Sequence, residues 1–159
     1  MNRDDAARQS DSNAAPQSPN LIAALNLPGF PLPGDMPQSD ATVLIIDDNV
    51  EGAQALADML EWEGCRTAHA INGKDALFHL RGSPLPCIIL LDLQMPVMNG
   101  WEFLEERRKD GVLAAVPVVV ISAVLRLPIC LDAKAILGKP VDMAILLALI
   151  TECRHSNWN

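Results

Sequence analysis

The stretch IILLDLQMPVMNG, residues 88–100, places a run of Ile and Leu directly before an aspartate, Asp92. Consecutive branched apolar residues are typical of a strand that is buried on both faces of a sheet. A carboxylate at the end of such a strand loses hydration, so it needs a compensating partner or a chemical role. The stretch therefore predicts a central strand that presents Asp92 at its carboxyl end.

The sequence around this stretch alternates between short apolar runs and patterns of helical period. The apolar runs predict strands at 42–47, 65–70, 87–92, 116–122 and 135–138. Apolar residues at helical spacing predict helices over 49–64, 71–82, 100–111 and 142–154. In the third helix the predicted apolar contacts are Trp101, Phe103 and Leu104, and Asp142 is placed to cap the last helix.

Strands that alternate with helices form a parallel sheet, because right-handed crossovers place helices on both of its faces. We therefore predict an α/β fold with a flavodoxin-like, doubly wound, five-stranded parallel sheet in the order 2-1-3-4-5. Ligands of such sheets bind at the carboxyl ends of the strands, where the strand order reverses between the first and third strands.

The first part of the chain has a different composition. Residues 1–40 are rich in proline, with Ser, Gln and Asn between. This composition predicts a disordered or loosely docked extension, followed by the folded domain at 41–154 and a tail at 155–159. The apolar stretch LIAALNLPGFPLPG, residues 21–34, could dock on the domain or on a partner, and the sequence leaves both possibilities open.

The bulk properties exclude several classes of partner. The chain has 159 residues and a formal net charge of −8, which disfavours binding to nucleic acid or to anionic membranes. It has neither an apolar run long enough to span a membrane nor the apolar core of a signal peptide, so we expect a cytoplasmic protein. Four scattered cysteines, without a disulfide or metal-site spacing, predict free thiols: Cys65, Cys87, Cys130 and Cys153.

Polar residues follow the predicted strands where the strands end. Asp47 and Asp48 follow the first strand, Asp92 ends the third, Ser122 ends the fourth and Lys139 follows the fifth. Two carboxylates about 4 Å apart repel by roughly 4 kcal/mol at an effective dielectric constant near 20. An ammonium group and a divalent cation would offset this repulsion, and Mg²⁺ prefers oxygen ligands. The set therefore predicts a Mg²⁺ site with room for a phosphoryl group.

Each of these residues has an ordinary structural explanation when it is taken alone. An aspartate after a strand often caps the next helix, a serine there is an ordinary loop residue, and Lys-Pro is a common turn. Their joint occurrence at successive strand ends favours a common chemical role.

The motifs LIIDDN (44–49), LLDLQMPVMNG (90–100), VVVISA (118–123) and GKP (138–140) resemble those of the receiver domain of bacterial response regulators. The resemblance extends from residue 42 to about residue 153 and is to the chemotaxis-regulator-like, single-domain type. It implies that Asp92 is the phosphoacceptor. It also implies that Mg²⁺ is bound by Asp92, by Asp48 directly, by Asp47 mainly through water, and by the backbone carbonyl of Gln94.

The resemblance also implies roles for the residues at the later strand ends. Lys139, joined to Pro140 by a cis peptide bond, would pair with the phosphoryl oxygens, and Ser122 would donate a hydrogen bond to the phosphoryl group. Two features depart from the family pattern. Ile136 stands where members usually have an aromatic residue, and the connection from Ser122 to Lys139 is short, with Pro128 in its middle. This connection predicts a shortened or irregular fourth helix.

The leading hypothesis is a receiver in two-component or phosphorelay signalling. It would take a phosphoryl group from a sensor histidine kinase or a histidine phosphotransfer protein and signal to a downstream protein target as a monomer or weak dimer. It would not be an enzyme, beyond self-catalysed phosphoryl transfer and autodephosphorylation. The alternative is a receiver-fold interaction module that no longer signals by phosphorylation. An aspartyl-nucleophile hydrolase is disfavoured, because Gln94 stands where its second acid is usual.

Overall fold

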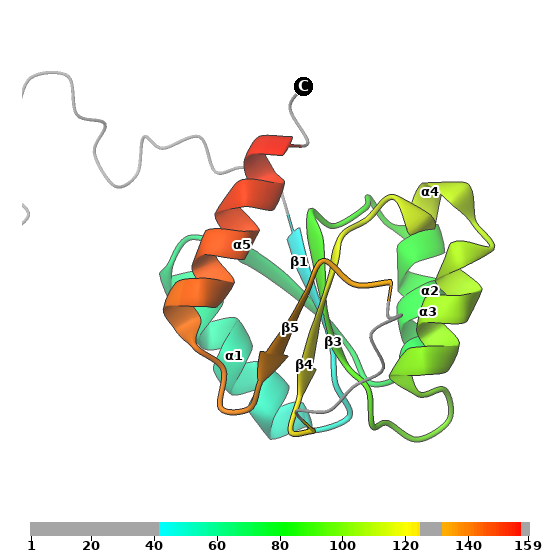
Figure 1. Cartoon of the computed structure of the whole chain (residues 1–159), viewed down its shortest axis with the longest axis horizontal. Helices are drawn as coiled ribbons and strands as arrows, with labels where there is room; N and C mark the ends of the chain where they lie inside the picture. The colour runs from blue at the N-terminus through cyan, green and yellow to red at the C-terminus, as the bar shows by residue number, and fades with distance from the viewer. Residues whose placement is uncertain (1–41, 125–131, 157–159) are drawn as a thin grey trace, which may run out of the picture. The chain divides into compact units, whose positions relative to one another are not determined.

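The computed structural model describes residues 42–124 and 132–156. These residues form a five-stranded parallel sheet in the order β2-β1-β3-β4-β5, which confirms the predicted fold (Figure 1). The strands are β1 (Thr42–Ile46), β2 (Arg66–Ala70), β3 (Ile88–Asp92), β4 (Val118–Ser122) and β5 (Ala135–Gly138). The extension and the end of the tail lie outside the described residues.

The helices cover both faces of the sheet, with α1 and α5 on one face and α2, α3 and α4 on the other (Figure 1). Their bounds are α1 (Val50–Trp62), α2 (Gly73–Gly82), α3 (Gly100–Arg108), α4 (Gly111–Ala114) and α5 (Met143–Ser156). No helix in the described part of the chain is long and apolar enough to cross a membrane.

The core is built by alternation along the central strands. In β3, Ile88 and Leu90 pack toward α1 and α5, whereas Ile89 and Leu91 pack toward α2 and α3. These side chains are all essentially buried, as the apolar run predicted. The edge strands β2 and β5 are partly exposed instead, because each has a neighbouring strand on one side only.

Local signals in the sequence explain where the helices begin. The side chains of Asn49, Asn72 and Asn99 accept hydrogen bonds from the first turns of α1, α2 and α3. The predicted cap on α5 is confirmed, since Asp142 Oδ1 accepts from the backbone N–H groups of Ala144 and Ile145.

The third helix differs from the prediction. It ends at Arg108, and Asp110 then caps a separate short helix, α4, through the backbone N–H groups of Val112 and Leu113. Trp101 was predicted to make apolar contacts but is 38% exposed, whereas Arg107 is 2% exposed. The inward-facing side of the helix is therefore built by Phe103, Leu104 and the buried Arg107.

The connection between β4 and β5 is the region of the predicted irregular fourth helix. Residues 125–131 of this connection lie outside the described residues, so the prediction stays untested there. The short helix labelled α4 is a different element, because it precedes β4. Of the four predicted free thiols, Cys65, Cys87 and Cys153 are free and buried, and Cys130 lies outside the described residues.

Candidate functional site

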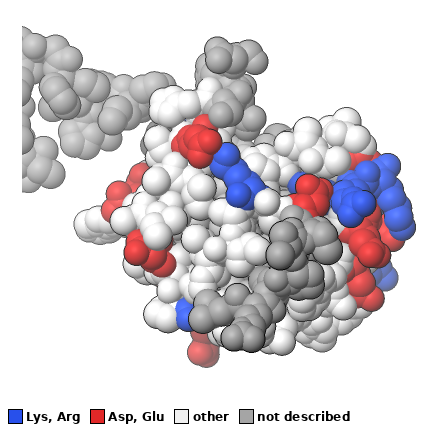
Figure 2. Space-filling view, in the orientation of Figure 1, with Lys and Arg blue, Asp and Glu red and all other residues white. Residues whose placement is uncertain are grey.

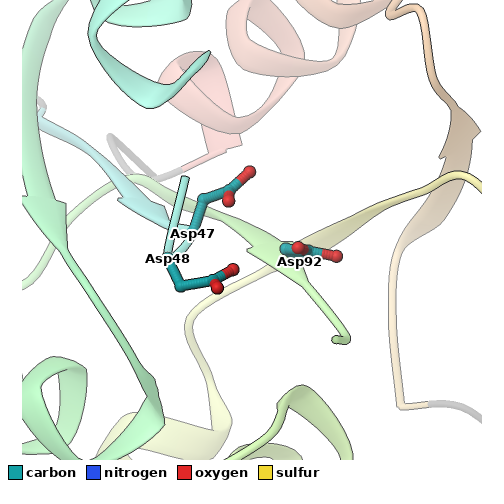
Figure 3. A group of neighbouring side chains, drawn as sticks. All are labelled: Asp47, Asp48 and Asp92. Carbon is teal, nitrogen blue, oxygen red and sulfur yellow. The ribbon is translucent and has the colours of Figure 1, made fainter. Parts of the chain in front are cut away.

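Two neighbouring strands bring the acidic residues together. β1 and β3 pair side by side, with Ile46 opposite Leu91, so Asp47 and Asp48 emerge next to Asp92. Figure 3 shows the three carboxylates at the ends of these strands, and one oxygen atom from each lies within 4.8 Å of the others. The predicted convergence of the three aspartates at the switch point is therefore present in the structure.

Lys139 reaches this cluster from the end of β5. Its Nζ lies 3.2 Å from Asp47 Oδ2 and 3.6 Å from Asp92 Oδ2. The peptide bond from Lys139 to Pro140 is cis, as the resemblance implied. One ammonium group thus bridges two carboxylates, and Asp48 has no ion pair with any described residue.

Asp92 is the most enclosed of the three acids, with 12% of its side chain exposed. Burial raises the pKa of its carboxyl group, and the negative charge of Asp47 adds to this effect. The backbone N–H of Gln94, which donates to Asp92 Oδ1 at 3.3 Å, and the charge of Lys139 both act to lower the same pKa. The raised pKa indicates that desolvation of the carboxylate outweighs these compensating contacts.

Ser122 ends β4, the strand beside β3, where Asp92 lies opposite Ile121. The serine is 2% exposed, and its Oγ accepts a hydrogen bond from the backbone N–H of Val124 at 3.1 Å. Its carbonyl accepts from the backbone N–H of Lys139 at 3.0 Å, which connects the ends of β4 and β5. Ser122 therefore lies at the carboxyl ends of the strands, as the acidic cluster does.

The loop after Asp92 is held close to the end of β3. The backbone N–H of Gly100 donates to the carbonyl of Leu93 at 3.0 Å. A Cβ atom on Gly100 would lie 2.7 Å from the carbonyl oxygen of Asp92, so only glycine permits this approach. Asn99 and Glu102 form a reciprocal capping box at the start of α3, which fixes where the loop ends.

Sequence reasoning missed two residues that position Asp47. A ring nitrogen of His69, Nε2, lies 2.8 Å from the carbonyl oxygen of Asp47, and the backbone N–H of Asn49 donates to Asp47 Oδ1 at 2.8 Å. The contact of His69 follows from the pairing of β1 with β2, which places His69 opposite Ile45. An Asx-turn from Asp47 to Asn49 is a local signal that could have been recognised in the sequence.

The acidic cluster fits a hard divalent cation. Three carboxylates within reach of one another offer the oxygen ligands that Mg²⁺ prefers, and the exposure of Asp48 leaves room for coordinating water. Gln94 lies at the correct place in the chain, but coordination by its carbonyl stays a prediction.

An open cavity of about 420 Å³ adjoins the cluster. Its lining includes the polar side chains of Asp47, Asp92 and Lys139 and the apolar side chains of Met59 from α1 and Met143 from the start of α5. The site is therefore an acidic pocket that continues into an apolar groove between α1 and α5.

Comparison with known proteins identifies a family model, curated proteins and solved structures to which this chain is similar. A family model for the response regulator receiver domain matches residues 43–151. Protein PilH of Pseudomonas aeruginosa is 33% identical over 82 residues, which cover 52% of this chain and 67% of PilH. The receiver domain of the Francisella response regulator 1452 superposes with a TM-score of 0.66 and 26% identity, covering 74% of this chain and 99% of that domain.

Other curated relatives are longer than the matched region. A transcriptional regulatory protein CpxR homolog of Haemophilus influenzae is 40% identical over 81 residues, which cover 51% of this chain and 34% of that protein. The chain thus spans about a third of the length of this relative.

Proposed function

The chain belongs to the response regulator receiver domain family of two-component signalling, and we propose that Asp92 is its phosphoacceptor. The observation that carries this proposal is the convergence of three carboxylates with the ammonium group of Lys139. An acidic cluster with a shared ammonium is suited to hold a divalent cation and a phosphoryl group together.

In the proposed reaction, an oxygen of the ionised Asp92 carboxylate attacks the phosphorus atom of a phosphohistidine on a kinase or phosphotransfer protein. The new O–P bond forms as the P–N bond breaks, and the donor imidazole leaves with the electron pair of that bond. The product is an acyl phosphate on Asp92. The Nζ of Lys139 would donate to the phosphoryl oxygens, and Ser122 Oγ would donate a hydrogen bond to the same group.

We propose Mg²⁺ as the cofactor, held by Asp47, Asp48, Asp92 and the backbone carbonyl of Gln94. When bound, Mg²⁺ supplies positive charge that offsets repulsion among the carboxylates and the incoming phosphoryl group. Asp92 must be ionised to act as a nucleophile, although burial raises the pKa of its carboxyl group. The adjacent charge of Lys139 favours the ionised form and so supports the nucleophilic role.

The phosphodonor would approach through the groove between α1 and α5. Asp92 is largely enclosed, and the cavity that opens onto it is lined by apolar side chains such as Leu56 and Met59. A protein surface with apolar side chains around its phosphohistidine would cover this lining while the histidine enters the acidic end. The domain would then signal by protein contact, with no catalytic activity beyond its own phosphorylation and dephosphorylation.

The proposal is tested by incubating the 159-residue protein with acetyl phosphate or phosphoramidate in Mg²⁺ and measuring its mass by mass spectrometry. We expect the mass of one added phosphoryl group, absent from Asp92→Asn and strongly reduced when EDTA removes Mg²⁺. The matched control is Asp58→Asn, which makes the same charge change on α1 outside the acidic cluster and should still be phosphorylated.

The alternative, an interaction module that no longer signals by phosphorylation, predicts a different result. The protein would gain no phosphoryl group, and Mg²⁺ would not raise its melting temperature. The position of Ile136, 47% exposed where relatives usually carry an aromatic residue, is the observation that favours this alternative.

A further inference from the structure

A second groove lies between α2 and α3, on the face of the sheet opposite α1 and α5. Its volume is about 530 Å³, and its lining includes Lys74, Phe78 and Arg81 from α2, Glu106 from α3 and Met98 from the loop after Asp92. It shares no lining residue with the groove that adjoins the acidic cluster.

An exposed aromatic side chain marks this groove. Phe78 is 81% exposed, whereas the preceding Leu77 is 5% exposed and belongs to the core. An exposed phenyl ring beside an apolar floor offers a large area that a partner can bury, and aromatic side chains often dominate binding energy. Phe78 therefore provides an anchor point for another protein.

The basic side chains of α2 lie along the same line as this ring. Lys74, Phe78 and Arg81 are spaced four and three residues apart, so they share one face of the helix. Within the described residues neither Lys74 nor Arg81 forms an ion pair, whereas Glu106 across the groove is paired with Lys109. The charge that remains available in the groove is therefore positive, although the chain as a whole carries −8.

We propose that the α2–α3 groove binds an acidic segment of a partner protein that carries an apolar anchor. The anchor would pack against Phe78 and Met98, and carboxylates on either side of it would pair with Lys74 and Arg81. Figure 2 shows charged side chains of both signs gathered at the right of the molecule, over the side that carries α2, α3 and α4. A polar rim around an apolar centre is the usual composition of a protein interface.

Met98 lines the groove and also belongs to the loop that follows Asp92. The backbone N–H of Gly73, the first residue of α2, donates to the carbonyl of Met98 at 3.0 Å. A Cβ atom on Gly73 would lie 2.7 Å from Met98 Cγ, so the loop packs directly on the helix. The preceding Val97 has a φ of 72°, a costly conformation for a β-branched residue. A change at Asp92 that moves this loop would therefore reach the start of α2. This coupling rests on the proposed function.

The groove is tested by selecting binders to the unphosphorylated 159-residue protein from a random peptide library displayed on phage. Selected peptides are synthesised and titrated against the wild type, Phe78→Ala and the double variant Lys74→Glu with Arg81→Glu. We expect the selected peptides to carry acidic residues beside an apolar anchor. We expect Phe78→Ala and the double variant each to weaken peptide binding at least about tenfold. Phe78, Lys74 and Arg81 are exposed, so these variants should keep the melting temperature of the wild type.

The control variant is Trp62→Ala, which removes an exposed aromatic side chain from α1 on the other face. It should bind the peptides as the wild type does. Failure to enrich acidic peptides, or enriched peptides whose affinity is unchanged in the groove variants, would overturn the proposal. Binding of a labelled single-stranded oligonucleotide that is lost in the double variant would also overturn it, in favour of nucleic acid.

The coupling is tested separately by repeating the titration after treatment with acetyl phosphate and Mg²⁺, with Asp92→Asn as the control. We expect the affinity of the wild type to change by about fivefold or more, with no change for Asp92→Asn. An unchanged affinity of a fully phosphorylated protein would overturn the coupling and leave the phosphoacceptor role standing. If the protein gains no phosphoryl group, that result contradicts the proposed function. The titration of the unmodified protein still tests whether the α2–α3 groove binds acidic peptides.

Discussion

At the scale of single residues, the acidic cluster combines three carboxylates with one ammonium group. Lys139 contacts Asp47 and Asp92, whereas Asp48 is exposed and has no ion pair among the described residues. The cluster therefore carries more negative than positive charge when it holds no cation. This repulsion should reduce the free energy of unfolding of the metal-free protein.

Removing one carboxylate should relieve the repulsion. In EDTA, we expect Asp48→Asn and Asp92→Asn each to raise the melting temperature by about 2–8 °C, as a stabilisation near 1 kcal/mol does in a domain of this size. The exposed control Asp58→Asn should change stability by at most about 0.5 kcal/mol. Thermal unfolding followed by circular dichroism measures all three. If both site variants melt below the wild type, the acidic cluster is not a source of strain.

The pH dependence of the stability gain of Asp92→Asn tests whether the gain comes from removing an ionised carboxylate. The pKa of the Asp92 carboxyl is raised in the folded protein, so its ionised form is disfavoured by folding. Its contribution to stability is therefore most favourable below the unfolded pKa of about 3.9 and is lost as pH rises through the folded pKa. The advantage of Asp92→Asn should be full at neutral pH and should shrink as pH falls toward 4. An advantage that stays constant with pH would point to another cause.

At the scale of elements, the start of α3 is fitted closely against the end of β3. Gly100 begins the helix while its backbone donates to Leu93, and there is no space for a side chain between it and Asp92. The same contact thus sets the path of the loop that carries Gln94 and Met98. A change in the packing of α3 on β3 should therefore alter the position of Asp92, the proposed phosphoacceptor.

Gly100→Ala should test this close fit. The new Cβ would meet backbone atoms of Asp92 and Leu93 at 2.7 Å, so we expect a loss of roughly 1–3 kcal/mol in the free energy of unfolding and slower phosphorylation. Gly111→Ala is the matched control, because it also begins a helix but has no atom within 4 Å of the new Cβ. Urea unfolding and the acetyl phosphate assay measure both effects. Equal behaviour of the two variants would rule out the fit as the reason for glycine.

At the scale of the whole molecule, a buried arginine joins α3 to the residues that precede β5. Arg107 donates from Nη1 to the carbonyl of Val116, and its Nη2 lies 2.6 Å from Asp132 Oδ2. The arginine is 2% exposed, and its Nε has no hydrogen-bond partner among the described residues. The positive charge of the buried guanidinium is therefore compensated by the carboxylate of Asp132. This ion pair connects α3 to the residues that precede β5.

Asp132→Asn should weaken this connection. Removing the carboxylate leaves a buried guanidinium with neutral acceptors, so we expect a loss of about 1–2 kcal/mol in the free energy of unfolding. Lys109→Gln, which breaks an exposed pair with Glu106 on the same helix, should cost at most about 0.5 kcal/mol. Urea denaturation measures the loss in the free energy of unfolding for each of the two variants. A loss for Asp132→Asn no larger than that for Lys109→Gln would show that the pair does not stabilise the domain.

The sequence was sufficient to predict the five strands and the helices α1, α2 and α5, but it did not predict that α3 ends at Arg108 or that the short α4 follows it. The apolar run before Asp92 and the cap at Asp142 are local signals, because each acts on its own strand or helix. A parallel sheet with right-handed crossovers then leaves few possible arrangements. The convergence of Asp47, Asp48 and Asp92 follows from this topology.

Only the tertiary structure decided which groups meet and which side chains remain exposed. The shared contact of Lys139 with Asp47 and Asp92, the burial of Arg107 against Asp132 and the exposure of Phe78 join or separate residues far apart in the chain. Helical spacing predicts that one side of a helix is buried, but it does not predict which strand or helix packs against that side. That choice depends on strand register and on the packing of helices across the sheet, which no local pattern encodes.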